Sequence, residues 1–228
     1  MMPRRVAAGT GGDSMPKIGM EIVRRRQLID ATIAAIHEEG LANATISQIS
    51  RRAGLSGGIV AHYFQDKAGL LEATMRSLAE DLRRGVVDHL SRAQGPEARV
   101  FAVIDANFAP EQFTPEVVTV WLSFWSQLPS APRLARIHRI YERRMNSNLL
   151  HALKQLLPRA EAQHLTNGLA ALIDGLWLRC ALTGGAIQAE AARDTARDYV
   201  VTQLAALRRG AIPRHTVRTP HVAAGNEI

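Results

Sequence analysis

The sequence predicts an all-α protein of nine helices, in which a short N-terminal helix-turn-helix head is followed by a larger helical domain. Apolar residues recur at helical spacing along nearly the whole chain, and no segment shows the sustained alternation of a β-strand. Glycine and proline breaks divide this pattern into segments of helix length. We therefore expect the head at 17–73 and the C-terminal domain at 74–207.

The first helix is expected over 22–39. An apolar stripe runs along it, and Gly40 follows two glutamates where a helix would end. The stripe consists of Leu28, Ile29, Ile33 and Ile36.

The next helix is expected to begin at Ile46, because Thr45 and Gln48 have the spacing of a capping box. It should run over 46–53. Gly54 would end it after two turns, and Ser56 would cap a third helix over 56–63. Two short helices joined by a tight turn are typical of a helix-turn-helix, here at about 45–64.

Asp66 is expected to cap a fourth helix, from residue 67 to about 90. Proline and glycine breaks then delimit five further helices, at 96–108, 115–128, 132–156, 159–183 and 187–207. Residues 1–16 are expected to be a disordered leader or a start-site extension, since Met15 opens a segment typical of a protein start. Residues 208–228 are expected to be a basic disordered tail.

Composition narrows the class of protein. No apolar run approaches the roughly 18 residues of a membrane span. Arg4 and Arg5 are not followed by the apolar core of an export signal, so we expect a cytoplasmic protein. A single cysteine excludes an intramolecular disulfide and a thiolate metal cluster. The net charge of +7 favours a polyanionic partner, but the charge is spread evenly along the chain and locates no site.

Enzyme chemistry is not indicated. The sequence contains no HExxH motif, no G-x-S-x-G motif and no glycine-rich phosphate loop. The eight histidines are scattered without metal-ligand spacing. We therefore expect a non-enzymatic protein that needs no metal or cofactor.

The third predicted helix carries groups suited to DNA. Gly57 and Gly58 at its start are poor helix formers, which indicates a role other than stability. Without side chains there, the backbone can approach a phosphate, although a merely loose turn is the alternative. The candidate contacts that follow are His62, Tyr63 and Lys67 for phosphates, and Ile59 or Val60 for a thymine methyl.

Three consecutive arginines, Arg24, Arg25 and Arg26, lie near the start of the first predicted helix. Positive charge near the positive end of a helix dipole is unfavourable unless an anion lies nearby. A DNA phosphate would relieve that conflict. The alternative is that the three side chains point in different directions and are simply solvated.

A second constellation lies in the C-terminal domain. Trp121, Phe124 and Trp125 share one helix face, and Trp177 follows Asp174 by three residues on another helix. Aromatic faces with a carboxylate suit a quaternary ammonium ion, of which choline is the obvious small example. The alternatives are a core or dimer-interface stripe for the aromatic residues and a helix-helix polar contact for Asp174.

The segment TISQISRRAGLSGGIVAHYFQDKAGLLEA resembles the DNA-binding head of TetR-family regulators, and the similarity covers about residues 24–73. The resemblance implies that residues 57–61 read bases and that the last two long helices of two protomers pair in a homodimer. Packing within the head is the alternative for Tyr63 and the expected role of Phe64. The phosphate contacts that the family resemblance implies are Thr45, Ser56, His62, Tyr63 and Lys67.

A wider resemblance, from about residue 15 to 207, is to the choline-sensing members of this family, which repress genes of glycine betaine synthesis. It rests on MPKIGMEIVRRRQLIDATIAAI, WLSFW and GLAALIDGLWLRCALTGG, of which LIDGL occurs more widely in TetR-type regulators. It implies a dimer that binds a palindromic operator, controls choline uptake and glycine betaine biosynthesis for osmoprotection, and is released by choline. A repressor for another lipophilic or cationic ligand remains the alternative.

Overall fold

The computed structural model describes residues 17–112, 114–182 and 189–209, and every regular element in these ranges is an α-helix. This confirms the predicted fold class. The helices are α1 (Lys17–Glu39), α2 (Ile46–Arg52), α3 (Gly58–Phe64), α4 (Lys67–Arg92), α5 (Pro96–Asn107), α6 (Pro115–Gln127), α7 (Pro132–Leu153), α8 (Arg159–Leu182) and α9 (Ala189–Arg208).

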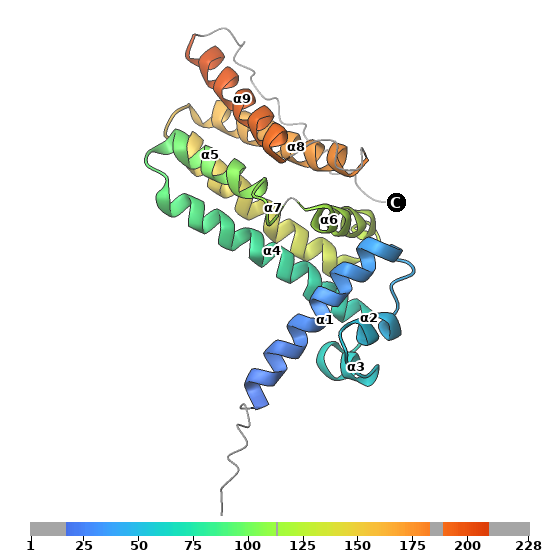
Figure 1. Ribbon diagram of the computed structural model, residues 1–228. Coiled ribbons are helices and arrows are strands. Elements are labelled where there is room, and N and C mark those ends of the chain that lie inside the picture. The colour runs from blue at the N-terminus through green and yellow to red at the C-terminus, as the bar shows by residue number, and fades with distance from the viewer. Residues whose placement is uncertain (1–16, 113, 183–188, 210–228) are drawn as a thin grey trace, which may run out of the picture.

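The helices form a small head at one end of the molecule and a helical bundle at the other (Figure 1). In the head, α1 packs against α2 and the first part of α4, and α3 leads into α4 through a tight turn. The long helix α4 continues into the bundle, where it packs against α5 and α7. Helices α8 and α9 lie at the end opposite α2 and α3 (Figure 1). One element, α4, therefore belongs to both parts.

One hydrophobic core runs through both parts of the molecule. In the head it includes Leu28, Ile49 and Phe64, and in the bundle it includes Phe124 and Leu169. Because buried side chains are closely packed, a displacement in one part is transmitted to its neighbours. The core thus joins the two parts mechanically.

Most predicted helices agree with the structure to within a few residues, and two differences have clear causes. Helix α1 includes residues 17–21, ahead of the expected start at 22, and its first turns are exposed at Met20, Ile22 and Val23. That part of the helix carries no buried stripe, so periodicity could not reveal it. Helix α7 ends at Leu153 because residues 154–156 form a turn.

Several expectations lie outside the described residues. They are the leader at 1–16, the tail from residue 210 onward, and the ends of the two helices that flank 183–188. Arg208, assigned to the tail, is instead the last residue of α9. No described helix is long and apolar enough to cross a membrane. Among the described residues no group of three His, Cys, Asp or Glu side chains could hold a metal ion.

Candidate DNA-binding face and ligand site

The start of α2 is fixed by the capping box that the sequence predicts. Gln48 N donates to Thr45 Oγ1 over 3.3 Å, and Thr45 N donates to Gln48 Oε1 over 2.8 Å. Both ends of the box are therefore satisfied, which confirms the expected helix start. Thr45 remains exposed at the rim of the head.

The turn between α2 and α3 follows the helix-turn-helix pattern, with one correction at its end. Gly54 adopts a positive φ of 68°, and Leu55 N donates to Ser50 O over 2.8 Å. Ser56 is exposed but does not cap α3, since Gly57 occupies the N-cap position and makes no side-chain bond. The N–H groups at the start of α3 thus have no side-chain cap, as an anion site requires.

One face of α3 is exposed and the other is buried in the head. Gly57, Gly58, Ala61 and His62 are exposed, and Tyr63 is half-buried. We call these residues, together with the half-buried Ile59, the α3 face.

Val60 lies on the core side of the helix and is fully buried, so it cannot reach a thymine methyl. The prediction of Val60 as a base contact is therefore wrong. Phe64 is buried as well, which confirms the expected packing role.

The glycine pair at the start of α3 is not required by the chain itself. A Cβ added to Gly57 or Gly58 would meet no heavy atom within 4 Å, and neither residue has a positive φ. An alanine would therefore fit the isolated fold at both positions. Steric crowding and backbone angle therefore do not explain the glycine pair, which leaves the N-cap role of Gly57, a loose turn or close approach to a partner surface as the reason.

Substitution of Gly58 tests this interpretation. We expect Gly58→Ala to keep or raise the free energy of unfolding, by up to about 1 kcal/mol, because alanine favours a helix. Operator affinity should fall by about tenfold, the cost of a lost DNA contact. Thermal unfolding and fluorescence anisotropy with an operator duplex measure the two quantities. Gly85→Ala in α4 is the control, since it too meets nothing within 4 Å; an equal affinity loss there would contradict the interpretation.

The three adjacent arginines have different surroundings. Arg25 Nη1 donates to Tyr63 O over 2.8 Å, and the Arg25 guanidinium lies 4.6 Å from the centre of the Phe64 ring. Arg25 thus braces the end of α3. Arg26 pairs with Asp30 at 2.9 Å and Asp81 at 3.6 Å.

Arg24 has no hydrogen bond or ion pair within the part of the chain that the structure describes. Of the three arginines, Arg24 is therefore the one without a partner among the described residues, whereas Arg25 also holds α3 in place.

The turn from α3 to α4 is unusually close. Gln65 has a φ of 70°, a region that L residues rarely adopt, and Asp66 Oδ1 accepts from Gly69 N over 2.7 Å. A Cβ on Gly69 would lie 2.0 Å from Phe64 O. Gly69 is therefore needed to bring α4 against the end of α3. The sequence analysis missed it, although a glycine in the first turn of a capped helix was the available signal.

Lys67 lies at the start of α4 and is half-buried. Its Nζ donates to Leu41 O over 3.2 Å, so the side chain ties α4 to the loop after α1. An ammonium has three N–H donors, and two are left for a phosphate. The predicted phosphate contact of Lys67 is therefore compatible with this structural contact.

The C-terminal domain brings aromatic rings from α6 and α7 together. Trp121 and Tyr141 have ring centres 5.6 Å apart, and Tyr141 lies 6.2 Å from His138. His138 also packs against Trp125, with ring centres 6.2 Å apart. Phe124 is fully buried in the core. The helix face predicted from the sequence thus meets a second face, on α7, which the sequence analysis did not single out.

Two carboxylates lie beside these rings. Burial raises the pKa of Asp174 to about 6, and the nearby charge of Glu142 adds to the effect. Burial also raises the pKa of Tyr141, with further contributions from the charges of Asp174 and Glu142. Glu142 Oε1 lies 3.3 Å from His138 Nε2. A negative group that has been partly removed from water favours a cation as its partner.

We call this group the aromatic-acid cluster. It consists of Trp121, Trp125, His138, Tyr141, Glu142 and Asp174. The residues missed by the sequence analysis, His138, Tyr141 and Glu142, are spaced i, i+3 and i+4 on α7, and this spacing was the available signal. Trp177 is buried on α8, one turn beyond Asp174.

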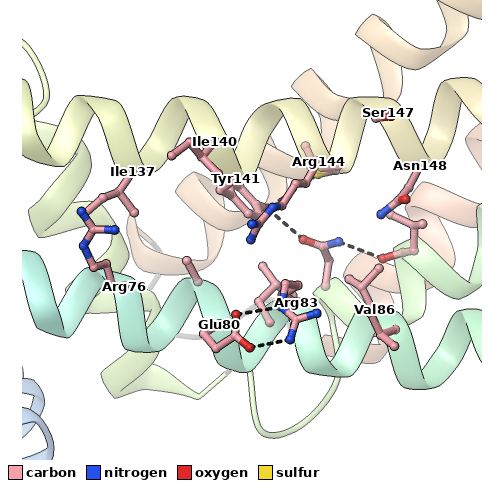
Figure 2. A pocket seen from close by; sticks show the side chains of 16 residues that line it. Arg76, Glu80, Arg83, Val86, Ile137, Ile140, Tyr141, Arg144, Ser147 and Asn148 are labelled. Atoms are coloured by element: carbon pink, nitrogen blue, oxygen red, sulfur yellow. Dashed lines mark hydrogen bonds and ion pairs between the residues drawn. The ribbon is translucent and has the colours of Figure 1, made fainter.

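A groove opens next to the aromatic-acid cluster, between α4 and α7. Its volume is about 580 Å³, within the range of small-molecule sites. Figure 2 shows Glu80 and Arg83 of α4 across from Ile140 and Tyr141 of α7. Tyr141 belongs to both groove and cluster, and its hydroxyl donates to Asn107 Oδ1 over 3.1 Å. The Tyr141 side chain therefore lines the groove and contacts the aromatic-acid cluster.

A polar contact connects α6 to the head. His37 Nδ1 of α1 lies 3.3 Å from Thr119 Oγ1, which is two residues before Trp121. Because the Thr119 hydroxyl donates to Pro115 O over 2.7 Å, His37 is the donor in this contact. Helix α6 thus contacts α1 on one side and carries two rings of the aromatic-acid cluster.

Comparisons with known proteins agree with this geometry. The family model of bacterial regulatory proteins of the tetR family matches residues 28–74, and that of the BetI-type transcriptional repressor C-terminal domain matches residues 96–222. The helix-turn-helix-type transcriptional regulator BetI of Escherichia coli is 47% identical over 192 residues, which cover 83% of this chain and 98% of that protein.

Solved structures show the same fold. A transcriptional regulator from Pseudomonas aeruginosa PAO1 superposes with a TM-score of 0.72 at 26% identity, covering 82% of this chain and 94% of that one. A regulator from Saccharomonospora viridis, solved in complex with choline, has a TM-score of 0.68 at 18% identity and covers 79% and 96%. At 18% identity, the likeness to the Saccharomonospora viridis regulator shows a shared fold alone.

Proposed function

Because the chain belongs to the TetR family of bacterial regulators, and by its C-terminal domain to the BetI-type transcriptional repressors, we propose that it is a repressor released by choline. Its targets are genes for choline uptake and glycine betaine biosynthesis, and it acts on chromosomal DNA in the cytoplasm. It is a regulator and not an enzyme. The observation that carries the ligand assignment is the aromatic-acid cluster, where aromatic rings lie near the partly desolvated carboxylate of Asp174.

The proposed DNA contact places the α3 face in the major groove. The exposed backbone at Gly57 and Gly58 lies against a phosphate, while His62 and Tyr63 donate to neighbouring ones. Ile59 supplies an apolar contact. Phosphate contacts at the rim come from Arg24, Thr45, Ser56 and Lys67. Arg25 and Arg26 act indirectly, Arg25 by holding α3 against α1 and Arg26 by holding α1 against α4.

A homodimer would present two such heads to a palindromic operator. Leu178 on α8 and Val201 on α9 are both about half exposed, at 46% and 49%, and Leu182 is 76% exposed. These apolar residues lie on the two helices at the end away from the head (Figure 1). Pairing of α8 and α9 across a twofold axis would bury them. The two heads would then address half-sites about one helical turn of DNA apart.

The proposed ligand site holds the trimethylammonium group of choline against aromatic faces. Trp121 and Tyr141 supply the ring quadrupoles, and Asp174 and Glu142 supply compensating charge. This cation cannot donate a hydrogen bond from its methyl groups, so rings serve it better than carbonyl oxygens. Choline binding then shifts α6, and the His37–Thr119 contact passes that shift to α1 and the head.

A pH dependence follows from the raised pKa of Asp174. Below about pH 6 its carboxyl holds a proton, which a cation must displace, so choline affinity should fall by up to about tenfold per pH unit. His138 lies next to Glu142. Its protonation would repel the cation and would also lower choline affinity at low pH. Calorimetry from pH 5 to 8 measures this. An affinity that stays constant over that range would contradict the assignment of Asp174.

Operator binding with and without choline tests the function as a whole. A labelled duplex from the upstream region of the target operon should be bound specifically, and millimolar choline should release it. Absence of specific binding would contradict the repressor assignment. Specific binding that choline does not change would contradict only the ligand assignment.

The groove between α4 and α7 supports a second candidate ligand class. Val86, Val103 and Ile137 give it an apolar lining, which a lipophilic cation would fill better than choline does. Calorimetry with choline, betaine aldehyde and a hydrophobic cation separates the two. A preference for the hydrophobic cation would favour a broad drug-type sensor.

A further inference from the structure

Two buried nitrogens of the aromatic-acid cluster have no hydrogen-bond partner. They are Trp125 Nε1 and His138 Nδ1, on neighbouring rings whose centres are 6.2 Å apart. An unpaired polar atom removed from water costs free energy of about 1 to 3 kcal/mol. Such atoms are rare in the interior of a protein, so each one calls for an explanation, of which a bound ligand is one.

The two nitrogens have opposite hydrogen-bonding roles. The indole Nε1–H of Trp125 is a donor only. The other ring nitrogen of His138, Nε2, lies 3.3 Å from Glu142 Oε1, so its hydrogen is directed to that carboxylate. Burial lowers the pKa of His138, which keeps the ring neutral and leaves Nδ1 as an acceptor. The two adjacent rings therefore offer one donor and one acceptor.

A hydroxyl group matches this pair, because its oxygen can accept one hydrogen bond while its hydrogen is donated in another. We propose that Trp125 and His138 recognise the hydroxyl of a quaternary ammonium alcohol, with Nε1–H donating to its oxygen and Nδ1 accepting its hydrogen. This inference rests on the proposed choline site. It deepens that proposal by assigning the end of the ligand that the aromatic faces do not hold.

The arrangement distinguishes choline from glycine betaine, in which a carboxylate replaces the hydroxyl-bearing carbon. A carboxylate accepts from Trp125 Nε1 but has no hydrogen for His138 Nδ1. It also brings a negative charge towards Asp174 and Glu142. The alcohol is therefore bound and the acid is rejected, so the sensor responds to the precursor and not to the oxidised compound.

The test compares choline with propyltrimethylammonium, in which a methyl group replaces the hydroxyl. Calorimetry on the full-length wild-type dimer should show choline binding about 10- to 100-fold more tightly, because the isostere leaves both nitrogens unpaired. Trp125→Phe and His138→Phe should each reduce that ratio towards one. If His138→Phe does not fold, as judged by circular dichroism, Trp125→Phe carries the test alone.

Trp121→Phe is the matched control. It weakens the aromatic face for both cations alike and should leave the ratio between them unchanged, because Trp121 Nε1 is not among the unpaired buried atoms. Equal affinity of the wild-type protein for the two cations would overturn the inference while leaving the choline site intact. Binding of neither cation would overturn the inference together with the proposed function.

Discussion

Asp174→Asn is expected to abolish the response to choline and to leave operator binding intact. The substitution keeps the size of the side chain but removes the charge that we propose compensates the cation. Loss of one partner of a partly buried charge pair costs about 2 kcal/mol or more, which corresponds to at least about 30-fold weaker choline binding. Calorimetry gives the choline affinity, and anisotropy with the operator duplex gives the DNA affinity before and after choline addition.

The same substitution should not lower stability at neutral pH. The pKa of Asp174 is raised from 3.8 to about 6, so the folded state binds the proton more tightly than the unfolded state. The contribution of this group to stability is therefore complete below pH 3.8 and is lost as pH rises through about 6. Removing the carboxylate should therefore raise the free energy of unfolding by up to about 3 kcal/mol at pH 7.5. Thermal unfolding at pH 5 and 7.5 measures the difference.

Asp88→Asn is the control for the loss of a negative charge, since Asp88 is exposed on α4 and forms an exposed ion pair with Arg92, one helical turn away. It should change neither choline affinity nor stability appreciably. If Asp174→Asn retained wild-type choline affinity, Asp174 would be a helix-helix contact and not part of the ligand site.

Gly69→Ala is expected to abolish operator binding through a different route. Its Cβ would lie 2.0 Å from Phe64 O, a backbone atom that cannot move without shifting α3. Overpacking of this kind costs about 3 kcal/mol, so we expect a lower free energy of unfolding and a displaced α3 face. Urea unfolding and operator anisotropy measure both effects.

The contrast with Gly58→Ala separates two roles of glycine in the head. Both variants should lose operator affinity, but only Gly69→Ala should lose stability, because Gly58 has open space around it. Full stability of Gly69→Ala would contradict the account of the turn between α3 and α4.

The parts of the fold that local sequence controls could be predicted. The capping box at Thr45 depends on residues three apart, and the proline and glycine breaks act on their own backbone, so both lie within reach of pattern analysis. The tryptophan face on α6 followed from helical spacing for the same reason. The resemblance to the TetR family then identified the DNA-binding head and DNA as its partner.

The parts that depend on packing between helices could not be predicted. His138, Tyr141 and Glu142 became candidates only when α7 was seen against α6 and α8, since no short-range rule pairs these helices. Similarly, the packing of Arg25 against Phe64 could not be predicted from the run of three arginines. Spacing shows which residues share a face, but it does not show which face meets which partner.

The most direct test of the central claim is the reciprocity of choline and operator binding. If choline releases DNA by favouring a DNA-incompatible arrangement of the heads, operator DNA must weaken choline binding by the same factor. Calorimetric titration of choline into the wild-type protein, alone and saturated with operator duplex, measures that factor. We predict that choline binds less tightly to the DNA-bound protein, by the factor by which choline weakens operator binding. Equal choline affinity in the two titrations would contradict a choline-gated repressor.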